Sequence, residues 1–104
     1  MADKPDRGIA VAPKDKGEII ALVQALMPDA RVYLFGSRAT ESFSRASDID
    51  IALDTGQEID VAVLGEVREV LNATDIPQKI DVVDLHMIPD AMRDAIVSKG
   101  ILWK

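Results

Sequence analysis

Apolar residues recur along much of the chain at spacings of three and four, a period that predicts amphipathic helices. The pattern covers residues 15–27 and residues 59–71. Pro28 ends the first of these helices, because proline cannot continue the backbone hydrogen-bond ladder. Pro89 suits the first turn of a third helix, which we expect to run to about residue 98.

Short runs rich in β-forming residues alternate with these helices and predict strands. The runs cover residues 31–35, 48–53 and 79–85, and residues 101–103 add a short edge strand. Residues 37–46 are polar and small, which indicates a loop with room for one helical turn. The fold class expected from this order is α/β (α+β): a small mixed β-sheet with helices packed on one side.

The length of the chain sets the domain organisation that we expect. Residues 1–14 contain two prolines and no period, which is typical of a flexible N-terminal arm, and residues 15–104 would form a single domain. The sequence contains no apolar run long enough to cross a bilayer and no signal-peptide core, so we expect a cytoplasmic protein without a membrane partner. Cysteine is absent, which excludes disulfides and thiolate metal sites.

The negative net charge bears on whether the protein binds nucleic acid or metal ions. The 12 lysines and arginines are outnumbered by 18 acidic residues, and the formal charge is −6. Proteins that grip nucleic acid usually neutralise several phosphates with basic side chains, so nucleic-acid binding is not expected. Acidic side chains can instead hold a divalent metal.

Two carboxylates interrupt an apolar strand and are the first candidates for such a metal site. Asp48 and Asp50 are two residues apart, so on a strand they share one face, with Cα atoms about 6.5 Å apart. Two like charges at this distance repel each other, and a bound Mg²⁺ would relieve the repulsion. The bland alternative is a solvent-facing stripe on an amphipathic strand.

A third carboxylate belongs to the strand predicted over residues 79–85. If Ile80 and Val82 point to the core, Asp81 lies on the polar face beside the first pair. Asp84 is the alternative for this metal-binding role. Its position in the strand would point it to the core, but it lies near the strand end and could instead reach solvent. Three carboxylates on adjacent strands can hold two metal ions for in-line phosphoryl displacement.

A Gly-Ser pair precedes the carboxylates and could form a phosphate cradle. Glycine lets the backbone approach a phosphate closely, and the hydroxyl of Ser37 can donate to a phosphate oxygen. Arg38 would add positive charge there, with a surface salt bridge as the alternative. Gly36 and Ser37, taken alone, would also fit an ordinary strand-ending turn.

The segments "GSRA", "SDIDIAL" and "KIDVVDL" together resemble the nucleotidyltransferase superfamily of DNA polymerase β. The chain looks most like its minimal members, the stand-alone nucleotidyltransferases found beside HEPN-domain proteins. The resemblance covers residues 15–85, and no departure from the core motif is visible.

The resemblance implies a role for each motif residue. Asp48 and Asp50 would bind two Mg²⁺ ions, and Asp81 would bind the catalytic metal and help to deprotonate the attacking hydroxyl. Gly36 and Ser37 would hold the β- and γ-phosphates of ATP or another nucleoside triphosphate. The reaction implied is transfer of AMP to a tyrosine of a HEPN toxin, which would make the chain an antitoxin.

Two rival functions remain open from the sequence. The chain could neutralise its toxin by binding alone, without turnover. It could also modify a small molecule, although such enzymes generally use an acceptor domain that 104 residues do not provide. Because the domain that helps larger relatives bind base or acceptor is missing, a partner or a second copy in a homo-oligomer would complete the site.

Overall fold

Three helices and a short 3₁₀ turn account for the helical part of the chain. The computed structural model describes residues 10–40 and 42–104, with α1 at Pro13–Leu26, α2 at Val61–Asn72, α3 at Asp90–Lys99 and the 3₁₀ turn η2 at Gly36–Ala39. Each α-helix begins and ends within two residues of its predicted bounds. The start of α2 at residue 61 has a local cause, because the Asp60 carboxylate accepts hydrogen bonds from the amides of Ala62 and Val63.

The first helix begins earlier than the predicted boundary of the N-terminal arm. Pro13 occupies the first turn of α1, a position where its missing N–H costs nothing. Val11 is buried in the core, so residues 10–14 belong to the folded domain. The remainder of the predicted arm, residues 1–9, lies outside the described residues.

Four strands form one mixed sheet in the order β3-β2-β1-β4, which confirms the predicted fold class. The strands are β1 (Arg31–Phe35), β2 (Ile49–Asp54), β3 (Ile80–Asp84) and β4 (Ile101–Leu102). β1 is antiparallel to both β2 and β4, whereas β2 and β3 run parallel and are joined through α2. The observed β2 starts one residue later than predicted, which leaves Asp48 just before the strand.

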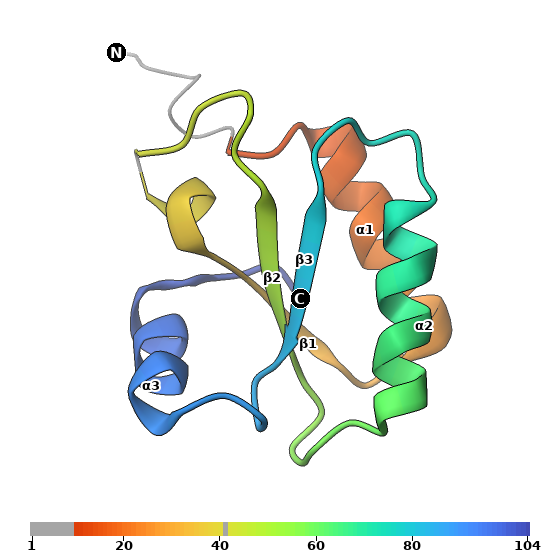
Figure 1. Cartoon of the computed structure of the whole chain (residues 1–104), viewed down its shortest axis with the longest axis vertical. Coiled ribbons are helices and arrows are strands. Elements are labelled where there is room, and N and C mark those ends of the chain that lie inside the picture. Colours follow the sequence, from red (N-terminus) through yellow and green to blue (C-terminus); the bar gives the residue numbers. More distant parts are fainter. Residues whose placement is uncertain (1–9, 41) are drawn as a thin grey trace.

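The two faces of the sheet carry different layers (Figure 1). α1 and α2 cover one face and build the main core with inward side chains such as Ile51, Leu53 and Val82. α3 lies on the opposite face, where Ile96 packs against Tyr33 and other residues of a smaller cluster. The expectation of helices on one side therefore holds for α1 and α2, while α3 partly covers the other face.

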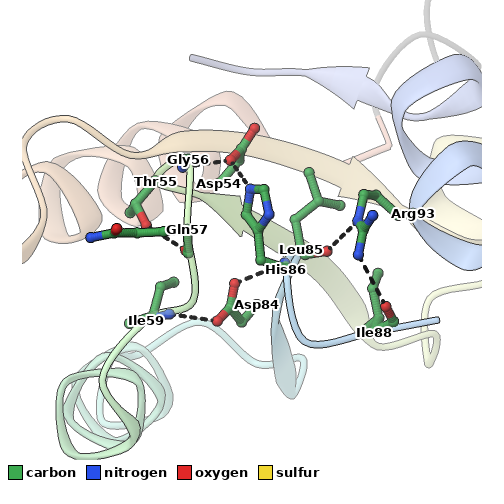
Figure 2. A network of polar contacts seen from close by, with 10 residues as sticks. All are labelled: Asp54, Thr55, Gly56, Gln57, Ile59, Asp84, Leu85, His86, Ile88 and Arg93. Carbon is green, nitrogen blue, oxygen red and sulfur yellow. Dashed lines mark hydrogen bonds and ion pairs between the residues drawn. The ribbon is translucent and has the colours of Figure 1, made fainter. Parts of the chain in front are cut away.

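A polar network fixes the far end of β2 and β3 (Figure 2). The Asp54 carboxylate lies 2.7 Å from Nε2 of His86 and accepts a hydrogen bond from the Gly56 amide. The Asp84 carboxylate is buried and accepts hydrogen bonds from the backbone amides of Ile59 and His86. Both carboxylates are thus engaged in holding loops, at the end of the sheet away from the Gly-Ser turn.

Among the helices of residues 10–40 and 42–104, none is both long enough and apolar enough to cross a membrane.

Candidate active site

Asp50 and Asp81 are neighbours across two parallel strands. They are register partners in the β2–β3 pairing, and adjacent strands lie about 4.8 Å apart. Both side chains belong to the face opposite the main core, because Ile49, Ile51 and Val82 fill that core. The predicted approach of Asp81 to the first carboxylate pair is therefore present in the backbone register.

Burial and neighbouring charges change the pKa of Asp50. Burial raises the pKa of Asp50 above its ordinary value, and the negative charges of Asp81 and then Asp48 raise it further. The Lys79 ammonium partly opposes this rise. Asp50 is half-buried whereas Asp48 and Asp81 are exposed, so the three carboxylates form an acidic site that opens to solvent.

Gly36 brings the Gly-Ser turn directly against Asp50. Phe35 is the register partner of Asp50, and the next residue, Gly36, has a positive φ of 74°. A Cβ atom at this position would lie only 2.3 Å from Oδ2 of Asp50. Glycine is therefore required twice, for the left-handed backbone and for the approach of the carboxylate. Ser37 follows in η2 and is half-buried.

Arg38 has a structural task that sequence analysis did not foresee. Its side chain is buried, and its guanidinium donates to the backbone carbonyls of Ser47, Ala10, Ser44 and Arg45. A planar guanidinium suits this use because its five N–H groups spread in a fixed fork. Three of these bonds hold residues 44–47, which precede β2, and the bond to Ala10 ties η2 to the segment before α1. Nucleotide contact by Arg38 stays a prediction, and the structure supplies this other role beside it.

The donor chemistry of the site fits Mg²⁺ that shares its ligands with a triphosphate. In the described parts of the chain, no group of three or more acidic or histidine side chains could hold a metal ion as arranged. Asp50 and Asp81, with Asp48 beside them, nevertheless offer oxygen ligands where burial and crowded negative charge raise the pKa of Asp50. Mg²⁺ usually binds one or two carboxylates and completes its shell with water and substrate phosphates.

Two features of the site were not predicted from the sequence. Lys79 affects the titration of Asp50, and its place directly before a strand that carries Asp81 was the available signal. A pocket of about 430 Å³ lies between η2 and α3 and shares Gly36 and Ser37 with the predicted phosphate cradle. It could not be foreseen because it depends on which face of the sheet α3 covers.

A small mixed sheet that sets a Gly-Ser turn against two adjacent strand carboxylates defines a nucleotide-transfer class of protein. The family model described as "Polymerase beta, Nucleotidyltransferase" matches residues 17–103. The chain belongs to this nucleotidyltransferase family.

Relatives and solved structures agree with that assignment. The chain is 29% identical over 85 residues to the "Probable protein adenylyltransferase MntA" of Haemophilus influenzae, an alignment that covers 78% of this chain and 75% of the relative. It is similar to a crystal structure of a toxin–antitoxin with AMP-PNP, with TM-score 0.74, 28% identity, and coverage of 86% of this chain and 72% of that one. It also resembles a structure of tri-AMPylated Shewanella oneidensis HEPN toxin with MNT antitoxin, with TM-score 0.69, 25% identity, and coverage of 88% and 70%.

Proposed function

We propose that this chain is a protein adenylyltransferase that acts as the antitoxin of a HEPN toxin. It transfers AMP from ATP to a tyrosine hydroxyl of the toxin. The observation that carries the proposal is the position of Gly36 against Asp50, with Asp81 as the register neighbour of Asp50. The names of the relatives support the reaction and the kind of partner.

Each residue of the site has a part in the proposed reaction. Asp48, Asp50 and Asp81 would hold Mg²⁺ together with the phosphates of ATP, and the metal would neutralise charge on the triphosphate and stabilise the leaving group. Gly36 and Ser37 hold the β- and γ-phosphates. Asp81 lies beyond Asp50 as seen from the Gly-Ser turn, on the side where the acceptor hydroxyl would enter.

The bond changes follow from an in-line displacement. The tyrosine oxygen forms a bond to the α-phosphorus, and the bond from that phosphorus to the bridging oxygen breaks, which releases pyrophosphate on the Gly36–Ser37 side. The hydroxyl proton passes to the Asp81 carboxylate or to solvent. Most of the rate enhancement would come from positioning and electrostatic stabilisation rather than from a separate base.

The test uses ATP labelled on the α-phosphate, Mg²⁺ and the purified HEPN protein that pairs with this chain. We expect label on a toxin tyrosine, and a loss of at least about a hundredfold in rate for Asp50→Asn or Asp81→Asn. Asp75→Asn is the matched control, because Asp75 is exposed in the connection between α2 and β3. Absence of label with the wild-type chain, or toxin neutralisation that persists undiminished in Asp50→Asn, would favour an antitoxin that acts by binding alone.

A further inference from the structure

The two outer edges of the sheet differ in how their backbone groups are bonded. β3 and β4 are the edge strands, because the strand order is β3-β2-β1-β4. An edge strand presents backbone N–H and C=O groups that have no neighbouring strand, and these groups can pair with another chain. The bonding at each edge therefore indicates where this sheet can accept a further strand.

Side chains of α2, which lies alongside β3, close the β3 edge (Figure 1). Asn72 accepts a hydrogen bond from the Ile80 amide at 3.0 Å and donates one to the Ile80 carbonyl at 2.9 Å. Arg68 donates to the Val82 carbonyl through Nε at 3.1 Å and through a terminal nitrogen at 2.9 Å. An incoming strand would have to displace these side chains, so the β3 edge is protected against strand addition.

The β4 edge is open. On its inner side the Trp103 amide donates to the Val32 carbonyl at 2.7 Å, and the Val32 amide donates to the Lys104 carbonyl at 3.1 Å. Leu102, the residue before Trp103, is the register partner of Tyr33. Because successive residues of an antiparallel ladder alternate in direction, the N–H and C=O groups of Leu102 point away from β1. Among the described helices and strands, β1 is the one that β4 contacts extensively, so both groups face the outer edge.

The side chains along the β4 edge are apolar at the centre and basic on either side. Ile101 is 43% exposed and Leu102 is 52% exposed, and as neighbours on a strand they belong to opposite faces of the sheet. Lys99 and Lys104, both exposed, flank this pair along the chain. Because the whole chain has a formal charge of −6, this run of positive charge is a local feature of the edge.

The basic residues distinguish between two occupants of the edge. A second copy, paired antiparallel about a two-fold axis at Leu102, would bring Lys104 of each copy next to Lys99 of the other. Like charges on adjacent strands repel, so self-pairing is disfavoured. The ammonium group of Lys16, which lies 5.7 Å from the centre of the Trp103 ring, adds to the same positive charge. An extended segment that carries carboxylates complements this charge.

We propose that the β4 edge binds an acidic, extended segment of a partner protein, which adds a further strand to the sheet. The backbone of the segment pairs with the N–H and C=O groups of Leu102, as in other cases of strand addition. Its side chains contact Ile101 on one face and Leu102 on the other, and its carboxylates lie near Lys99 and Lys104. The inference does not depend on the proposed AMP transfer, because Asp50 and the other carboxylates of the candidate active site take no part in it.

The test uses a fluorescein-labelled synthetic peptide of about ten residues that alternates glutamate and valine, titrated with the whole chain and followed by fluorescence anisotropy. The wild-type protein should bind it at least tenfold more tightly than the same peptide with lysine in place of glutamate, and added salt should weaken the binding. Leu102→Pro removes the outward N–H while the bonds between Val32 and residues 103–104 remain, and should lower the affinity at least fivefold. Lys104→Glu should lower it at least threefold.

Arg45→Glu is the matched control for charge, because Arg45 is exposed in the loop before β2, and it should change the affinity less than twofold. A peptide methylated on every backbone nitrogen separates strand pairing from simple charge attraction, and its binding should be at least tenfold weaker. Equal binding of the glutamate and lysine peptides, or full binding of the methylated peptide, would overturn the inference. A concentration-dependent dimer that Leu102→Pro abolishes, seen by analytical ultracentrifugation, would also overturn it by assigning the edge to a second copy.

Discussion

Gly36 lies against the Asp50 carboxylate of the candidate active site. Gly56 has a similar backbone conformation but no such contact, so it serves as a control for substitution at Gly36. Both glycines have positive φ, 74° and 86°, so alanine at either position carries a left-handed backbone cost of about 1–2 kcal/mol. Only at Gly36 would the new methyl meet a carboxylate, because nothing lies within 4 Å of a Cβ atom at Gly56. We expect both alanine variants to lose stability in urea denaturation.

The two variants should differ in activity. Gly36→Ala displaces the Asp50 carboxylate and should lower AMP transfer at least tenfold, whereas Gly56→Ala should transfer AMP at the wild-type rate at a temperature where both are folded. The measurement is the initial rate of labelling with α-labelled ATP. Equal rates for the two variants would show that contact with Asp50 does not set the geometry of the site.

Asp50 should also make the metal-free protein less stable at neutral pH. Burial and the charges of Asp81 and Asp48 raise its folded-state pKa above the ordinary 3.8. Since the folded state then binds the proton more tightly than the unfolded state, the cost appears as pH rises above about 3.8 and is complete above the folded pKa. Asp50→Asn should therefore raise the melting temperature by a few degrees at pH 7 in EDTA, and this gain should vanish near pH 3.

With Mg²⁺ and ATP present, the wild-type protein should melt at a higher temperature than Asp50→Asn. The wild-type protein should gain stability from the ligands while Asp50→Asn gains little, because only the wild type binds them through this carboxylate. Scanning fluorimetry of both proteins, with Asp75→Asn as the control for removal of an exposed charge, measures the effect. An Asp50→Asn variant that melts below the wild type in EDTA at pH 7 would contradict the assignment of repulsion at this site.

At the scale of elements, the loop between η2 and β2 depends on Arg38. Its guanidinium donates to three backbone carbonyls in the segment that leads from η2 to Asp48, and to the carbonyl of Ala10 before α1. Arg38→Lys keeps the positive charge but removes the planar set of guanidinium N–H groups, so some carbonyls lose their hydrogen-bond donor. We expect the free energy of unfolding, measured by urea denaturation, to fall by about 1–3 kcal/mol. Arg45→Lys is the control, because Arg45 is an exposed residue of the same loop. Unchanged stability together with weaker ATP binding in Arg38→Lys would instead assign this residue to the phosphates.

The carboxylates of the sheet also divide into two groups by the end of the strand at which they lie. Asp50 and Asp81 lie near the starts of β2 and β3, beside the Gly-Ser turn. Asp54 and Asp84 lie at the ends of the same strands and bind loop amides and His86 (Figure 2). Burial opposes ionisation of Asp54, but the hydrogen bond from Gly56 and the contact with His86 outweigh it and lower its pKa.

At the scale of the molecule, one face of the sheet packs the main core and the other carries the candidate active site. α1 and α2 bury the apolar side chains of β1, β2 and β3, which leaves the opposite face only partly covered by α3. The acidic site and the pocket lie together on this partly covered face. In the proposed reaction the acceptor hydroxyl would therefore approach from this face, while the main core lies on the other face.

The sequence by itself predicted the elements and the motif residues, because these depend on local order along the chain. Helix and strand periods, Pro89 at the start of the third helix and the spacing from Gly36 to Asp48 and Asp50 are all visible without a fold. The motif resemblance then indicated the family, which the family model confirms. Asp84 shows the limit of such reasoning. Its position in the strand pattern did not indicate that its carboxylate accepts hydrogen bonds from two backbone amides.

Only the tertiary structure determined which distant segments of the chain lie side by side. The parallel register that sets Asp81 beside Asp50, the burial of Arg38 under four carbonyls, and the position of α3 on the open face all join segments distant in the sequence. Such pairings depend on the packing of the whole chain rather than on any local period, since a strand pattern specifies which face is buried but not which strand lies beside it.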